Sequence, residues 1–164
     1  MNGLILTLFF FIALKFSISP TKPIAISDGD TFTILQDKRQ VRIRIDAIDA
    51  PEKGMPYYKK SKQYLSSLCF GKYVTLKVIK TDRYGRLVAR VILADGRDVS
   101  AEMIKAGMAW HYKHYSKDKT LATLEINARK NKLGLWNDTH PYAPWEIRKL
   151  HRKGISTKRL THQE

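Results

Sequence analysis

Apolar and polar residues alternate along residues 41–47, which read Val-Arg-Ile-Arg-Ile-Asp-Ala. Side chains of a strand point alternately to its two faces, so the apolar residues would face the core and both arginines would face the other way. The pattern therefore predicts a half-buried β-strand that presents Arg44 near its end.

The predicted strand leads into a bent, acidic loop. Pro51 fixes its own φ and drives Ala50 toward extended geometry, so Asp49 and Glu52 belong to a rigid loop rather than to a helix. Two carboxylates and Arg44 then share one strand end. We interpret this stretch as half of an active site.

Further β-rich runs and helical patterns follow the same logic elsewhere in the chain. Strands are predicted at residues 22–27, 31–35, 73–79 and 87–93, and helices at residues 61–70, 100–106 and 118–132, the second of them capped by Ser100. Most connections between the strands are too short for parallel crossovers. The pattern therefore favours an α+β fold that is mainly a small closed β-barrel of about five strands.

The first residues of the chain differ from the rest. Residues 3–18 are almost entirely apolar, and their unbroken core, residues 4–14, is short for a membrane-spanning helix and typical of a signal peptide. We therefore expect residues 1–19 to be a signal peptide and the protein to be exported, either secreted or periplasmic. An uncleaved N-terminal membrane anchor is the alternative.

The remaining chain has the length of one domain, residues 20–147, followed by a basic tail, residues 148–164. Six lysines or arginines fall between Arg148 and Arg159. From residue 137 onward we accordingly expect an extended arm with little core of its own.

Charge and cysteine content narrow the possible partners and sites. Thirty lysines and arginines against fifteen acidic residues give a net charge of +15, spread from Lys38 to Arg159. This excess favours a polyanionic partner, either nucleic acid or an anionic membrane surface. Cys69 is the only cysteine, which excludes an internal disulfide and a thiolate metal site, and its apolar neighbours favour a buried structural role.

Three acidic residues, Asp30, Asp49 and Glu52, are predicted at strand ends or in the loops beyond them. Clustered oxygen ligands without His or Cys suit a hard cation, Ca²⁺ or Mg²⁺, to which the backbone carbonyl of Ala50 could add a ligand. Each acid taken singly also fits an ordinary turn or loop. The hypothesis of a metal site therefore depends on their combination.

Two arginines complete the candidate site. A phosphodiester under attack gains negative charge on its equatorial oxygens, and a guanidinium group can meet two of those oxygens at once. Arg44 and Arg86 are the candidates, although each alone also fits a solvated strand face. Glu52 is the candidate to take a proton from a metal-polarised water.

These residues occur in three motifs that together closely resemble the staphylococcal nuclease family. The motifs are Asp28-Gly29-Asp30-Thr31, Arg44 followed by Asp49-Ala50-Pro51-Glu52, and Thr81-Asp82-Arg83-Tyr84-Gly85-Arg86, and the likeness covers residues 22–147. The resemblance implies an OB-fold barrel of five strands with three helices. It also implies a Ca²⁺-dependent endonuclease that acts on DNA and RNA and leaves 3′-phosphate ends.

The resemblance further implies a role for each residue of the motifs. Asp30 and Asp49 would bind Ca²⁺ together with the carbonyl of Ala50, and Glu52 would act as general base or position the attacking water. Both Arg44 and Arg86 would bind the phosphate and stabilise the transition state.

Further residues could contact a nucleic-acid substrate, and two alternatives to a nuclease stay open. Aromatic rings can stack on bases and cations can meet the phosphate backbone; the candidates are Tyr84, Tyr112, Tyr115, Lys53, Lys59, Lys60 and Arg83. His111 and His114 lack a convincing third ligand for zinc. A non-catalytic OB-fold nucleic-acid-binding module is the main alternative to a nuclease, and a basic membrane-surface protein is another.

Overall fold

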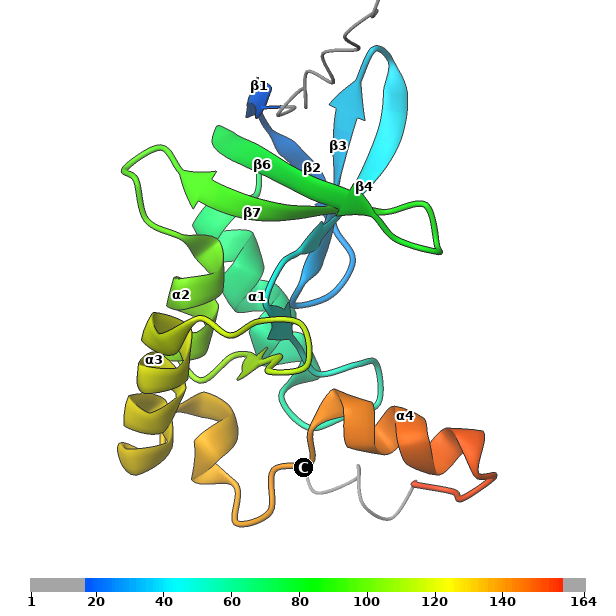
Figure 1. The fold of residues 1–164 in the computed structure, drawn as a ribbon, viewed down its shortest axis with the longest axis vertical. Coiled ribbons are helices and arrows are strands. Elements are labelled where there is room, and N and C mark those ends of the chain that lie inside the picture. Colours follow the sequence, from blue (N-terminus) through cyan, green and yellow to red (C-terminus); the bar gives the residue numbers. More distant parts are fainter. Residues whose placement is uncertain (1–16, 158–164) are drawn as a thin grey trace, which may run out of the picture.

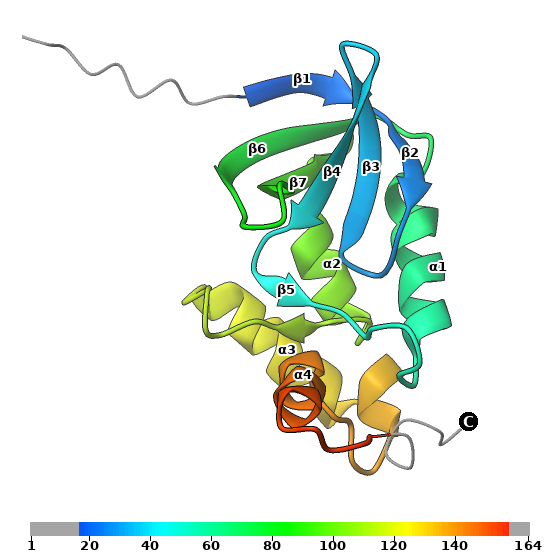
Figure 2. The same cartoon turned by 90° about the vertical axis from the view of Figure 1, so that its right-hand side faces the viewer.

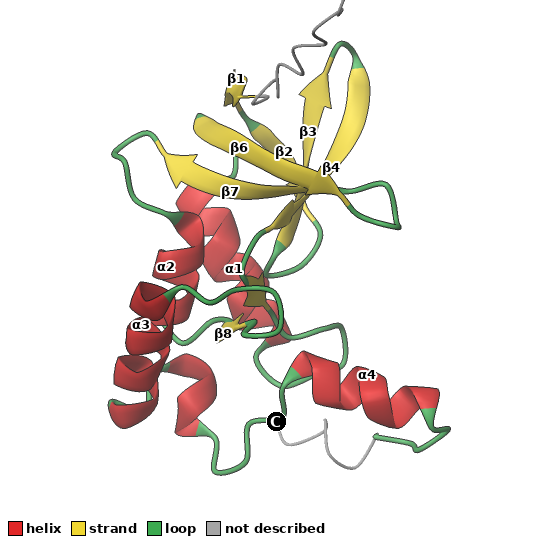
Figure 3. Cartoon of the chain, in the orientation of Figure 1, coloured by secondary structure: helices red, strands yellow, loops and turns green. Residues whose placement is uncertain are grey.

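The computed structural model describes residues 17–157, in which a curled sheet forms one end of the molecule and helices form the other (Figures 1 and 3). The sheet has the order β1-β6-β7-β4-β3-β2, and all neighbours are antiparallel except β4 and β7. Its strands are β1 (Ser17–Thr21), β2 (Pro23–Ile26), β3 (Thr31–Gln36), β4 (Arg39–Ile45), β6 (Val74–Thr81) and β7 (Leu87–Leu93).

The sheet nearly closes into a barrel because one stretch of chain supplies both of its edges. Only Lys22 separates β1 from β2, so the two are halves of one bent strand. The first half pairs with β6, where Thr21 lies opposite Val74, and the second half pairs with β3 (Figure 2). With β1 and β2 counted as one, the barrel has the five predicted strands. The α+β, mainly β fold class is thus confirmed.

The buried side chains of the barrel follow the predicted alternation. Ile43 and Ile45 of β4 are at most 1% exposed, whereas Arg42, the residue before Ile43, is exposed. The core continues beneath the barrel into the helices, where Leu65 and Met103 are fully buried. The barrel is therefore filled by side chains, and chemistry must take place at its rim.

The helices cover the lower end of the barrel and confirm the three that the sequence predicts, with shifted boundaries. They are α1 (Tyr58–Cys69), α2 (Val99–Lys105), α3 (Lys119–Lys130), a 3-10 turn η1 (Gly134–Asn137) and α4 (Pro144–Arg152). The first begins three residues before the predicted start. Cys69 at its end is buried, and burial raises the pKa of its thiol to about 12, in agreement with a structural role.

Two local predictions are wrong. The N-cap of α2 is Asp98, whose carboxylate accepts the N–H of Ser100 at 2.7 Å, whereas the Ser100 hydroxyl donates to the carbonyl of Asp46. The expected extended arm is also interrupted, because α4 forms within it and the boundary predicted at residue 148 falls inside this helix. A proline at the first helical position and a glutamate in the first turn are both helix-start signals.

The predicted N-terminal segment lies mostly outside the described residues. The strand β1 begins at Ser17, so a cleavage after Ser19 would divide it. Between residues 17 and 157, none of the helices is long and apolar enough to cross a membrane.

Candidate active site

The predicted acidic residues come together at the end of β4. The pairing of β3 with β4 sets Thr31 opposite Arg44, and the N–H of Ile45 donates to the Asp30 carbonyl at 2.8 Å. The chain then turns at Ala47, which has a φ of +64°, and continues as β5 (Ile48–Asp49), which pairs with β8 (Trp110–His111). Asp30 and Asp49 are therefore brought to one buried corner, although 19 positions separate them in sequence.

One arginine joins the two buried carboxylates. Arg44 Nη1 lies 3.2 Å from Asp30 Oδ2, and its Nη2 lies 3.1 Å from Asp49 Oδ1. The same Nη1 donates to the carbonyl of Ile45 at 3.0 Å. Because the Arg44 side chain is only 13% exposed, these bonds hold the guanidinium in one orientation.

Further hydrogen bonds orient Asp30. Its Oδ2 accepts the N–H of Ala50 at 2.8 Å, and its Oδ1 accepts the hydroxyl of Thr31 at 2.9 Å. The preceding residue, Gly29, packs so closely on α1 that a Cβ there would lie 1.9 Å from the Ser61 hydroxyl oxygen. Only glycine fits at this position, so Gly29 lets the chain pass close to α1 immediately before the site residue Asp30.

Burial and like charge shift the pKa values of two carboxyls in this corner. Burial raises the pKa of Asp49 to about 6. The positive charges of Arg148 and Arg44 lower this pKa, but their effect is smaller than that of burial. Burial, reinforced by the charge of Asp30, raises the pKa of Asp28 to about 7. A bound cation would favour the ionised form of such carboxyls, so the corner is suited to positive ligands.

Glu52 lies at the rim of the corner and is held by a residue that sequence reasoning placed in the tail. The Glu52 side chain is 44% exposed, and its Oε1 accepts Nη1 of Arg148 at 2.5 Å. Arg148 also donates from Nη2 to Asp49 Oδ2 at 2.6 Å. Arg148 is 96 positions from Glu52 and 99 from Asp49, and no sequence pattern links residues so far apart. The lysines and arginines around Arg148 also make it look like one of several equivalent basic residues.

Arg86 lies on the same face of the sheet but outside the carboxylate cluster. Its Nε donates to Asp82 Oδ2 at 2.8 Å, and its backbone N–H donates to Asp82 Oδ1 at 3.0 Å. In the parallel pair of β4 and β7, Arg44 lies opposite Val88, so Arg86, two residues earlier, falls on the Arg44 side. Arg86 thus lies in the turn just before β7, with Asp82 and the Tyr84 ring as its neighbours.

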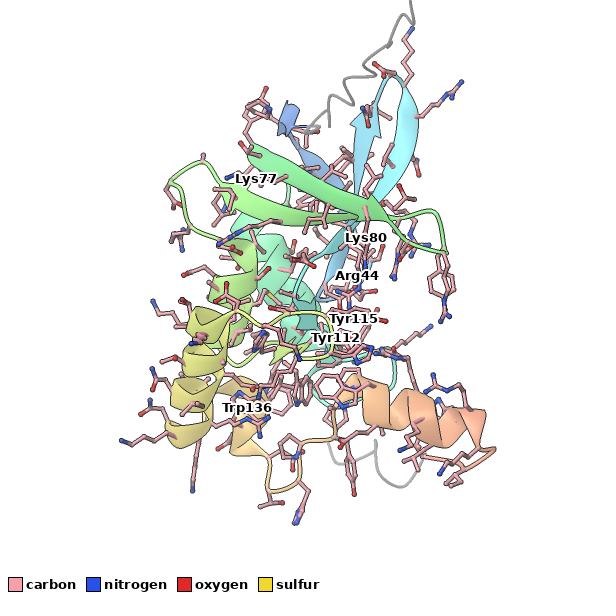
Figure 4. All side chains as sticks on the ribbon, in the orientation of Figure 1. Arg44, Lys77, Lys80, Tyr112, Tyr115 and Trp136 are labelled. Atoms are coloured by element: carbon pink, nitrogen blue, oxygen red, sulfur yellow. The ribbon has the colours of Figure 1, made fainter. Side chains whose placement is uncertain are left out.

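The candidate substrate contacts surround the same end of the barrel. Tyr84 and Tyr115 are 65% and 63% exposed, and Arg83 Nη2 donates to the Tyr84 hydroxyl. Tyr112 and Tyr115 lie below Arg44 in Figure 4, with their rings edge to face at 4.9 Å. Lys53, Lys59 and Lys60 are exposed on the loop after β5 and the first turn of α1.

The two histidines do not converge on a metal. His111 is 2% exposed and its Nε2 bonds to the hydroxyl of Ser116, whereas His114 is exposed and its ring meets Tyr115 edge to face. Across residues 17–157, no three His, Cys, Asp or Glu side chains gather as a complete metal site. Asp30 and Asp49 offer carboxylate oxygens side by side, a set that fits a hard cation whose remaining ligands are carbonyl, water or phosphate oxygens.

Comparison with known proteins identifies the family of this chain. The family model described as staphylococcal nuclease homologue matches residues 42–138. An uncharacterized endonuclease of Escherichia coli O157:H7 is 42% identical over 130 residues, covering 79% of this chain and 84% of the relative. The micrococcal nuclease of Shigella flexneri is 34% identical over 136 residues, covering 77% and 78%. An uncharacterized endonuclease of Haemophilus influenzae is 40% identical over 127 residues, covering 77% and 71%. The chain therefore belongs to the staphylococcal nuclease family.

Proposed function

We propose that the protein is a Ca²⁺-dependent endonuclease that hydrolyses phosphodiester bonds of DNA and RNA and leaves 3′-phosphate ends. The observation that carries the proposal is the buried guanidinium of Arg44 joined to Asp30 and Asp49, with Glu52 at the rim. A guanidinium group is permanently charged and can bind two phosphate oxygens at once, and the carboxylates beside it can bind a metal ion. Both features stabilise the negative charge that develops when a phosphodiester is attacked.

Asp30 and Asp49 are the residues that would hold Ca²⁺, together with the backbone carbonyl of Ala50. When bound, the ion would neutralise charge on the phosphate oxygens and lower the pKa of the attacking water. Hydrogen bonds already orient both carboxylates, and the ion would share Asp49 with the guanidinium groups of Arg44 and Arg148.

The Arg44 guanidinium has one edge free for a phosphate. Both Nη atoms face the carboxylates and the carbonyl of Ile45, while Nε makes no hydrogen bond within residues 17–157. A guanidinium presents Nε–H and one Nη–H as a second fork, which is suited to two phosphate oxygens. Arg86, held by Asp82 on the same sheet face, would meet the transition-state charge from the neighbouring strand.

In this proposal Glu52 activates the attacking water. Its Oε1 accepts the hydrogen bond from Arg148, and its side chain is 44% exposed. A carboxylate at the rim can accept the proton of the attacking water or orient that water. The exposed rings of Tyr84 and Tyr115, with Tyr112, Arg83 and Lys53 nearby, would bind the bases and phosphates on either side.

The protein is also inferred to act outside the cytoplasm, as an exported or membrane-anchored enzyme. The apolar run of residues 3–18 supports this location. N-terminal sequencing of the protein from the extracytoplasmic fraction should find a start near residue 20, or Met1 in a membrane fraction. A start at Met1 in the soluble cytoplasm would contradict export.

Calcium removal tests the proposed reaction. The full chain should cleave single-stranded DNA and RNA in Ca²⁺, release 3′-phosphate ends, and stop when a chelator is in excess. Binding of both nucleic acids without cleavage in Ca²⁺ would instead support the non-catalytic binding module. Gel analysis of end-labelled oligonucleotides distinguishes the two outcomes.

A further inference from the structure

Helix α4 reaches the carboxylate corner from the far end of the sequence, beyond the last residue of the family match, Asp138. Figure 1 shows α4 at the helical end of the molecule, below the loop that follows β5. Its first turn is fixed by Pro144 and by Glu146, whose carboxylate accepts the N–H of Ala143 at 3.0 Å. The element is therefore a formed helix rather than a loose tail.

Two apolar contacts seat α4 against the domain. Ile147 is 2% exposed. The ring of Trp145 stacks on that of Tyr112, with centroids 5.2 Å apart and planes 4° from parallel. Tyr112 follows β8, whose residues pair with β5, so the stack ties α4 to the strand that carries Asp49. Arg148 lies one turn after Trp145 on this anchored helix, which holds it against the carboxylates of Asp49 and Glu52.

Arg148 bridges two carboxylates that have different environments. Its Nη2 bonds to Asp49, which is 2% exposed, and its Nη1 bonds to Glu52, which is 44% exposed. Asp49 is already held from its other side by Arg44. For the Glu52 side chain, Arg148 is the hydrogen-bond partner that the described residues provide, so the position of Glu52 depends on α4.

We propose that Arg148 is a positioning residue of the active site. It holds the Glu52 carboxylate beside Asp49, with Oε1 occupied and Oε2 directed to the water that Glu52 activates. The C-terminal helix then completes a site whose other residues come from the barrel. This inference rests on the proposed nuclease function, because it concerns the residue that would activate water.

The side-chain chemistry favours positioning over an incidental surface ion pair. An exposed pair contributes little because water screens it and two long side chains must be ordered. Here one partner is buried, the helix is anchored, and the planar fork spans two carboxylates at once. A lysine presents a point charge and can serve only one of them well.

Substitution of Arg148 in the full chain tests the proposal. Arg148→Gln should lower kcat for a single-stranded oligonucleotide by about ten- to a hundredfold, as is typical when a group that orients an active-site ligand is lost. The KM should change far less than kcat, and Arg148→Lys should restore part of the loss. Arg152→Gln, which removes the same charge from an exposed site on the same helix, is the matched control and should keep full activity.

A double-mutant cycle separates positioning from a merely structural role. If Arg148 acts through Glu52, Arg148→Gln should have little further effect on kcat in a Glu52→Gln background. In Ca²⁺-free urea unfolding, the two substitutions together should lower the midpoint by less than the sum of their separate effects. Equal losses of kcat in both backgrounds would overturn the proposal.

Three other outcomes would also overturn it, and each has a distinct meaning. If the wild-type chain cleaves and Arg148→Gln cleaves equally well, the positioning role is wrong while the nuclease function stands. If Arg148→Gln cleaves faster and binds Ca²⁺ more tightly, α4 obstructs the site instead of completing it. Failure of the wild-type chain to cleave would remove the proposed function, and the positioning role with it, even if the unfolding cycle detects the contact.

Discussion

Replacing Glu52 by Gln is expected to slow Ca²⁺-dependent cleavage of single-stranded DNA by about 10²- to 10⁴-fold, the usual contribution of a positioned acid or base. The amide has nearly the same shape and can still accept the hydrogen bond from Arg148. It has no negative charge and cannot accept a proton from water. The single-turnover cleavage rate measures the effect without interference from product release.

Binding must be measured beside the rate to assign the loss to chemistry. Fluorescence anisotropy in excess chelator should show that Glu52→Gln binds the same oligonucleotide as tightly as the wild type. Glu102→Gln is the matched control, since Glu102 pairs with Arg97 and has no place in the proposed chemistry. An unchanged single-turnover rate in Glu52→Gln would exclude Glu52 from the mechanism.

Replacing Arg86 by Lys is expected to lower kcat by about 10²- to 10³-fold, the cost of removing a fixed donor that stabilises transition-state charge. Lysine keeps the positive charge but lacks the planar guanidinium that can donate two parallel hydrogen bonds. Lysine also lacks the Nε–H that bonds to Asp82 at 2.8 Å, so the ammonium would not be held on the Arg44 side of the sheet. Steady-state kinetics on a single-stranded oligonucleotide measures kcat and KM separately.

The neighbouring Arg83 supplies the control for this substitution. It is exposed in the same turn and its guanidinium bonds to the Tyr84 hydroxyl, so Arg83→Lys should alter KM more than kcat. Full kcat in Arg86→Lys would mean that a diffuse positive charge is sufficient there and that no bidentate contact forms in the transition state.

The sequence was informative where a short-range physical rule applies. Alternation along 41–47 correctly indicated which residues of β4 enter the core, because strand geometry gives a two-residue period. The acidic loop was located because Pro51 restricts the backbone on both sides of itself. Asp30 and Asp49 converge in the structure as the strand ends suggested.

What the sequence did not reveal depends on contacts between distant residues. The double role of residues 17–26, pairing with β6 and then with β3, results from barrel closure. The role of Asp82 as the anchor of Arg86 was hidden in a turn with several charges. The density of lysines and arginines around Arg148 indicates a basic tail, whereas the helix that carries Arg148 begins at Pro144.

The most direct test of the central claim, that the carboxylate corner hydrolyses phosphodiesters with Ca²⁺, is one cleavage time course on an end-labelled single-stranded DNA. Calcium is supplied, removed with a chelator, and then restored, while binding is followed in parallel. The account predicts that cleavage to 3′-phosphate products stops on removal and resumes on restoration, with the DNA still bound throughout. Cleavage that continues in the chelator, or binding in Ca²⁺ with no cleavage at all, would contradict it.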